Sequence, residues 1–128
     1  MSRLTLHATG PARPETAWQR YVDVDQWASW SPQIKAVHTA RRHLAPGLSG
    51  TVEAVLGIRA AFVVDTVDHD RRTWTWRVRL GPVRLRLHHT VSTHARGSRA
   101  GLTISGPMPA VAAYAPLARL ALHRLVRP

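Results

Sequence analysis

Two side chains of this sequence could carry proton chemistry in an apolar setting, His89 and Tyr114. His89 is the titratable member of an alternating apolar stretch, and Tyr114 lies in an alanine-rich stretch near the C-terminus. An imidazole can act as a general acid or base or orient a ligand, and a phenol can present its hydroxyl to a cavity. Burial would lower the pKa of His89 and favour the neutral imidazole. A structural hydrogen bond is the alternative role of this histidine.

Large apolar side chains alternate with polar ones on both sides of Gly81-Pro82. Successive strand residues face opposite sides of a sheet, and a two-residue turn at Gly81-Pro82 would fix the pairing of the two strands. Trp76 then faces Leu87, and Trp74 faces His89. The side chains expected to contact an apolar ligand are Trp74, Trp76, Val78, Leu85, Leu87, His89, Leu102, Ile104 and Tyr114. Simple packing against a helix is the other interpretation of this set.

The same register predicts two opposed pairs of arginines on the outer face of the sheet, Arg77 with Arg86 and Arg79 with Arg84. Like charges directly opposite each other destabilise a sheet. The face is therefore either a solvated surface with splayed side chains or an anion-binding surface. No aromatic residues alternate with these arginines, so stacking of single-stranded nucleic acid on this face is poorly supported.

Several classes of chemistry are excluded or unsupported. The sequence has no cysteine, which excludes disulfides, thiolate catalysis and cysteine-ligated zinc. His88 and His89 point to opposite faces of their strand, and the other histidines have no metal-binding spacing. The chain lacks a phosphate-binding loop, a nucleophile elbow and a dinucleotide fingerprint. We therefore expect no metal site and no cofactor.

The elements that must position these side chains follow from the periodicity. A strand over Arg3 to Thr9 precedes a helix that begins at Pro14 and a second short helix over Gln26 to Trp30. The strands expected next are Ile34 to Arg41, Ser49 to Leu56, Arg59 to Val67, Thr73 to Leu80, Val83 to Val91 and Arg99 to Met108. Helical periodicity then runs from Pro109 to about Arg127, with a kink expected at Pro116. The class is α+β, with the last helix covering an antiparallel sheet.

Three segments near the N-terminus carry a family resemblance: 12–18, 21–23 and Trp27-Ala28-Ser29-Trp30-Ser31-Pro32. They resemble the opening of the polyketide cyclase/dehydrase group of the SRPBCC (START/Bet v 1-like) superfamily. The resemblance implies a helix-grip fold: a curved antiparallel sheet of about seven strands around a long C-terminal helix, with two short helices after the first strand. It also implies an internal apolar cavity, which the shortness of this chain suggests is modest or partly open. The superfamily shares no universal catalytic set, so no catalytic residue is carried over.

Three functions remain open. The first is a cavity protein that binds a polyketide-like or aromatic molecule and, if it is an enzyme, catalyses cyclisation or dehydration with His89 and Tyr114 handling protons. The second is a non-catalytic carrier of a lipid or metabolite. The third is an interaction module whose arginine face (Arg77, Arg79, Arg84 and Arg86) binds RNA, the ribosome or another acidic partner.

The totals set the remaining bounds. The chain has 128 residues and is 45% hydrophobic, which fits a single domain over 1–128 with a substantial core. No apolar run is long enough to span a bilayer, and the N-terminus lacks the apolar core of a signal peptide, so we expect a cytoplasmic protein, monomeric or homodimeric. The net charge of +11 attracts anions, whether nucleic acid, membrane surface or acidic ligand.

Overall fold

The computed structural model describes residues 2–128, which form a seven-stranded antiparallel sheet and three α-helices. The strands are β1 (Ser2–Gly10), β2 (Ile34–Thr39), β3 (Ser49–Ala54), β4 (Arg59–Asp68), β5 (Thr73–Leu80), β6 (Val83–His94) and β7 (Gly97–Gly106). The helices are α1 (Pro14–Val22), α2 (Trp27–Trp30) and α3 (Met108–Leu125), with single 3-10 turns at η1 (Val24–Gln26) and η2 (Val55–Gly57). The strand order is β1-β7-β6-β5-β4-β3-β2, so the first and last strands are neighbours.

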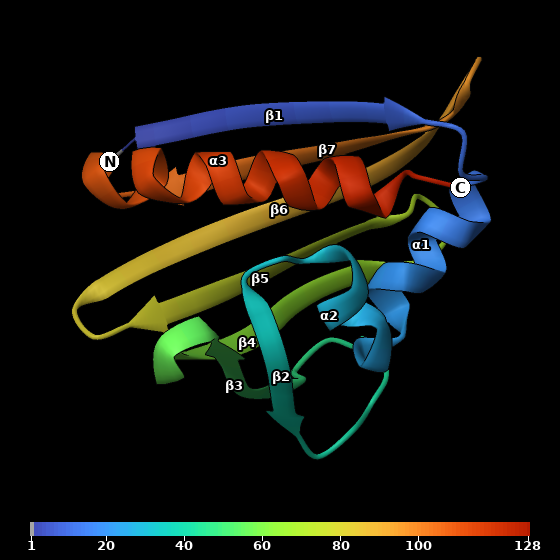
Figure 1. Cartoon of the computed structure of the whole chain (residues 1–128). Coiled ribbons are helices and arrows are strands. Elements are labelled where there is room, and N and C mark those ends of the chain that lie inside the picture. The colour runs from blue at the N-terminus through green and yellow to red at the C-terminus, as the bar shows by residue number, and fades with distance from the viewer. Residues whose placement is uncertain (1) are drawn as a thin grey trace.

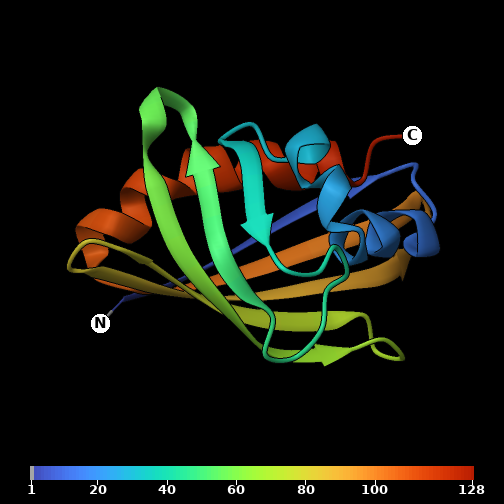
Figure 2. The ribbon, with the colours of Figure 1, turned by 90° about the horizontal axis from the view of Figure 1, so that it is seen from below.

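The predicted helix-grip architecture is confirmed. The sheet curves around α3, which lies along β1 and β7, while α1 and α2 fill one end of the concave side (Figure 1). Seen from below, β2, β3 and β4 rise steeply away from the plane of the other strands (Figure 2). Irregular pairings between Ile34 and Ala36 and between Val64 and Thr66 mark bulges, which bend strands of this half of the sheet.

The hairpin of β5 and β6 has the register expected from the sequence. Trp76 pairs with Leu87 and Trp74 with His89, and the two connecting residues are Gly81 and Pro82. Gly81 has a positive φ of 58°, which suits the first position of a tight hairpin turn and would strain a residue with a Cβ. This register places the apolar side chains of both strands on the concave face.

The C-terminal helix differs from its expected form at two points. Its first residue is Met108, which was expected at the end of β7 and is instead largely exposed in the first helical turn. Its last residue is Leu125, two residues before the expected end near Arg127, and Pro116 lies inside the helix. Within residues 2–128, no helix is long and apolar enough to cross a membrane.

Contacts from α1 and β1 hold the C-terminal end of α3. Arg20 Nη1 donates hydrogen bonds to the carbonyl oxygens of Leu125 at 2.6 Å and Arg127 at 2.7 Å. Ala12 N donates to Val126 O at 3.0 Å. A Cβ on Gly10 would lie 2.3 Å from the same Val126 oxygen, so this close approach requires glycine. The carbonyls at the end of α3, which lack helical partners, are therefore capped by α1 and by the β1–α1 connection.

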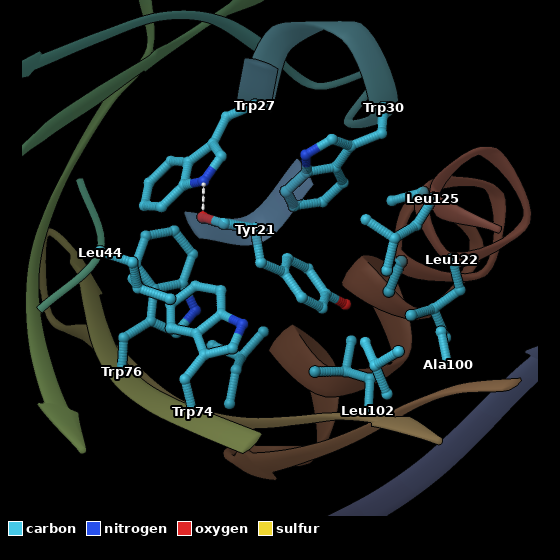
Figure 3. Packing of buried hydrophobic residues seen from close by; sticks show 14 of the residues in the cluster. Tyr21, Trp27, Trp30, Leu44, Trp74, Trp76, Ala100, Leu102, Leu122 and Leu125 are labelled. Atoms are coloured by element: carbon cyan, nitrogen blue, oxygen red, sulfur yellow. Dashed lines mark hydrogen bonds between the residues drawn. The ribbon is translucent and has the colours of Figure 1, made fainter. Parts of the chain in front are cut away.

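Aromatic side chains fill the core beneath α1 and α2 (Figure 3). Trp27 stacks on Trp74 with ring centroids 5.8 Å apart, and Tyr21 packs edge-on against Trp30 and Trp74. The Trp27 indole Nε1 donates to the backbone oxygen of Tyr21 at 2.8 Å, which ties α2 to α1. This cluster closes one end of the space between the sheet and α3, so any cavity must lie toward the other end.

Candidate ligand-binding site

A cavity of about 370 Å³ lies between the sheet and the N-terminal half of α3. Its walls come from β2 to β6, from the segment before β2 and from α3. The lining residues are Gln33, Ile34, Val52, Ala54, Ile58, Ala60, Trp76, Val78, Leu80, Val83, Leu85, Leu87, Ala110, Ala113, Tyr114 and Leu117. The volume falls at the lower end of the range of small-molecule sites.

The helical wall of the cavity is one face of α3. Ala110, Ala113, Tyr114 and Leu117 are spaced as i, i+3, i+4 and i+7, the spacing that places side chains on one side of a helix. Two of the four are alanines, and the short side chains leave the space that larger residues would occupy. The C-terminal half of the helix carries Leu122 and Leu125 instead, which are fully buried in the core.

The cavity opens at the end of the sheet away from α1 and α2. Three large hydrophobic residues of its lining are substantially exposed: Ile58 after η2, Leu80 at the end of β5 and Leu117 on α3. These side chains are contributed by three separate elements, so they mark the mouth through which a ligand would enter.

Polar atoms are few in the cavity wall and belong to Gln33, Tyr114 and Trp76. Gln33 Nε2 donates to the Tyr114 hydroxyl at 2.8 Å. Burial raises the pKa of Tyr114 to about 12, partly offset by the bond from Gln33, so its hydroxyl stays protonated and can donate. Gln33 Oε1 and Trp76 Nε1 are buried without a hydrogen-bond partner in residues 2–128. Both atoms are shielded within the packed wall, so the protonated Tyr114 hydroxyl is the donor best placed to meet a ligand, and the lining includes no charged side chain.

His89 does not line this cavity. It lies on the concave face as expected, but its ring stacks on Trp74 at 3.9 Å between centroids and packs edge-on against Tyr21. Nδ1 is 3.3 Å from the backbone oxygen of Trp74. Burial lowers the pKa of His89 to about 3, so the imidazole is neutral near pH 7. The side chain is a hydrogen-bonded member of the aromatic core.

Five of the nine expected ligand contacts line the cavity and four do not. The five are Trp76, Val78, Leu85, Leu87 and Tyr114. The other four, Trp74, His89, Leu102 and Ile104, are buried in the core. Tyr21 of α1 packs against Trp74 and His89, and Trp27 of α2 stacks on Trp74. Trp74 and Leu102 are seen within this cluster in Figure 3. The two groups belong to one continuous concave face, and the position of the covering helices divides it.

Gln33, Leu80 and Val83 also line the cavity, and of these only Leu80 and Val83 have a signal in the sequence. Gln33 follows Pro32 at the start of a strand and precedes the inward-facing Ile34, and no periodicity distinguishes it. Leu80 and Val83 flank the predicted turn and pair with each other. Their alternation with Arg79 and Arg84 would have placed both side chains on the concave face.

The arginines of the outer face are paired as the register predicts, Arg77 with Arg86 and Arg79 with Arg84. Arg77 also forms an ion pair with Asp65 at 3.0 Å. In residues 2–128, no carboxylate lies within 4 Å of the guanidinium groups of Arg79, Arg84 or Arg86, all of which are exposed. These side chains border a shallow groove of about 470 Å³ on the outside of the sheet.

The fold is shared with solved structures of low sequence identity. Ara h 8.0201 superimposes with a TM-score of 0.79 at 13% identity, covering 98% of this chain and 95% of its own. Protein CV1439 from Chromobacterium violaceum gives a TM-score of 0.74 at 15% identity, covering 98% and 96%. The hypothetical protein jhp0584 from Helicobacter pylori gives 0.78 at 15% identity, covering 97% and 84%. The class is the SRPBCC, or START/Bet v 1-like, helix-grip fold.

Within this class the sequence itself identifies the family. The chain belongs to the family described as polyketide cyclase/dehydrase and lipid transport, whose model matches residues 1–127. No curated protein matches the sequence. This match confirms the family resemblance inferred from the sequence.

Proposed function

We propose that this protein binds an uncharged, polyketide-like or aromatic small molecule in the cavity under α3. The observation that carries the proposal is the lining: apolar side chains, interrupted only by the Gln33–Tyr114 pair and the Trp76 indole. A charged ligand would lose its hydration without gaining a counter-ion. The description of the family, with its cyclases and lipid transport proteins, supports an apolar ligand.

The Gln33–Tyr114 pair favours a ligand that carries a hydroxyl or carbonyl group on an apolar skeleton. The Tyr114 oxygen accepts from Gln33, and its own proton is available to donate. A ligand oxygen can accept that proton, whereas a pure hydrocarbon would leave it unpaired. Oxygenated aromatic and polyketide-like molecules therefore fit the cavity better than plain hydrocarbon chains.

Binding without catalysis is the role that the chemistry of the site supports best. Tyr114, with its raised pKa, holds its proton and is suited to orient a ligand oxygen rather than to act as a base near pH 7. His89 is separated from the cavity by its place in the aromatic core. A cyclisation or dehydration reaction would then depend on how the cavity folds the substrate, with Tyr114 as the one hydroxyl donor.

Calorimetric titration with two ligands of matched shape tests the proposal. The neutral 2-naphthol should bind at least about ten times more tightly than the anionic 2-naphthoate, because the carboxylate would be buried without a partner. Equal affinity for the two ligands, or tighter binding of the anion, would overturn the assignment of an uncharged ligand.

A further inference from the structure

The mouth of the cavity is surrounded by exposed aliphatic side chains, which we call the apolar rim: Leu56, Ile58, Leu80 and Met108. Leu56 is 94% exposed at the tip of the β3–β4 connection, and Met108, at the start of α3, is 59% exposed. Ile58 and Leu80 also line the cavity, and the connection, the β5–β6 turn and the start of α3 lie at the same end of the molecule (Figure 1). Large aliphatic groups gathered on one exposed end mark an interaction surface.

The backbone at Leu56 holds its side chain outward at a conformational cost. Leu56 has φ 64° and ψ 21°, a left-handed conformation that leucine rarely adopts. The neighbouring Gly57 also has a positive φ, of 74°. A leucine that is both strained and almost fully exposed contributes nothing to the core, so its apolar surface is available to a partner.

Arginines lie beside the apolar rim. Arg79 directly precedes Leu80, and Arg84 is its cross-strand partner. Arg86 lies two residues after Arg84, on the same face of β6. Ser105 of β7 pairs with Arg86 on one side and with Arg3 of β1 on the other, so Arg3 lies near the same cluster. The two acidic groups on this part of the sheet, Glu53 and Asp65, already pair with Arg59 at 3.1 Å and Arg77 at 3.0 Å. The surface next to the mouth is therefore strongly cationic.

We propose that this end of the protein docks on membrane surfaces that contain anionic lipid. The apolar rim would enter the boundary between headgroups and acyl chains, while Arg79, Arg84 and Arg86 contact lipid phosphates. Docking in this orientation would set the cavity mouth against the bilayer, so that an apolar ligand could pass between them without crossing water. Leu56, Met108 and the arginines do not line the cavity, so docking through them holds or fails independently of which ligand the cavity binds.

RNA is the other anionic surface that the arginines could meet, and the rim argues against it. Sequence-independent binding of single strands uses aromatic side chains on which bases stack. The rim is aliphatic, and the outer faces of β5 and β6 carry no Phe, Tyr or Trp; their one imidazole, His88, is hydrogen-bonded to Thr75. A bilayer uses both features of this end, whereas RNA would use only the arginines.

Cosedimentation of the full chain with vesicles tests the proposal. The protein should bind vesicles of equimolar phosphatidylcholine and phosphatidylglycerol, and binding should weaken with salt. The double variant Arg79→Glu/Arg84→Glu should lose about 25-fold or more in partition coefficient, since each arginine near an anionic surface contributes about 5-fold. Arg96→Glu/Arg99→Glu has the same net charge, with the changes at the far end of β7, and should lose less than about 5-fold. The milder pair Arg79→Gln/Arg84→Gln covers the case in which charge reversal impairs folding.

The apolar contribution is tested by Leu56→Asn/Met108→Gln. Neither residue lines the cavity, and asparagine tolerates the left-handed backbone at position 56. This variant should bind the vesicles about tenfold more weakly, with 2-naphthol affinity unchanged. Three results would overturn the proposal: no binding to the anionic vesicles, equal losses from the two charge-reversal pairs, or full binding by Leu56→Asn/Met108→Gln. If the protein binds polyuridylate through Arg79 and Arg84 but does not bind vesicles, the surface belongs to an RNA partner instead. If the protein is a dimer that Leu56→Asn/Met108→Gln dissociates, the surface belongs to a second copy of the chain.

Discussion

The imidazole of His89 lies flat on the indole of Trp74, with ring centroids 3.9 Å apart and planes 7° from parallel. The two residues are cross-strand partners, and Nδ1 of His89 also lies 3.3 Å from the Trp74 carbonyl oxygen. Tyr21 of α1 closes over the pair. The imidazole that the sequence offers as a candidate acid or base is thus enclosed in the core, where it affects the stability of the fold.

His89 should make the protein less stable as the pH falls. Burial lowers its pKa in the folded state from 6.5 to about 3, so the unfolded chain binds the proton first as the pH drops below 6.5. Stability is therefore lost progressively between about pH 6.5 and pH 3, by up to about 1.4 kcal/mol per pH unit. His89→Phe keeps an aromatic ring in the stack and removes the titratable group. Between pH 7 and pH 5, its free energy of unfolding, measured with urea, should fall by about 2 kcal/mol less than that of the wild type. The exposed His123→Gln is the control, and a wild-type slope in His89→Phe would contradict the assignment.

Tyr114→Phe should weaken ligands that carry a hydroxyl group and spare those that do not. The substitution removes a protonated donor from the cavity wall and leaves the Gln33 amide without its 2.8 Å partner. Affinity for 2-naphthol should fall about 3- to 10-fold, the usual range for one hydrogen bond, whereas affinity for 2-methylnaphthalene should not fall. Titration calorimetry measures both, and equal losses for the two ligands would mean that Tyr114 acts by packing alone.

Arg20→Gln should destabilise the fold without changing ligand affinity. The guanidinium bridges the carbonyls of Leu125 and Arg127 at the C-terminal end of α3, and the cavity lies under the other half of the helix. Loss of these charge-assisted bonds should lower the free energy of unfolding by about 1–3 kcal/mol. Arg13→Gln, at an exposed arginine next to α1, should change it by less than about 0.5 kcal/mol. Equal stabilities of the two variants would refute the capping role.

The strand pattern was predictable because the physics that sets it is local. Alternation of Trp74, Trp76 and Val78 with polar residues fixes which side of β5 is apolar, and the Gly81-Pro82 turn fixes its partner strand. The residue at which β7 ends and α3 begins was harder to predict, because only Pro107 separates the end of β7 at Gly106 from the start of α3 at Met108.

The division between core and cavity could not be read from the same pattern. Trp74 and Trp76 alternate in one strand and share one face, yet only Trp76 lines the cavity. Trp27 of α2 packs against both rings, but Tyr21 of α1 packs against Trp74 alone of the two. Helix placement depends on contacts between segments distant in sequence. The Gln33–Tyr114 bond joins residues 81 positions apart and was hidden for the same reason.

A bulky side chain placed inside the cavity gives the most direct test of the central claim. Ala60 lines the cavity, whereas its neighbour Ala61 faces outward on the same strand, so Ala60→Phe and Ala61→Phe form a matched pair. Calorimetry with 2-naphthol should show at least about a tenfold loss of affinity for Ala60→Phe and an unchanged affinity for Ala61→Phe, provided that both variants remain folded by circular dichroism. Unchanged binding by a folded Ala60→Phe would contradict a ligand site between the sheet and α3.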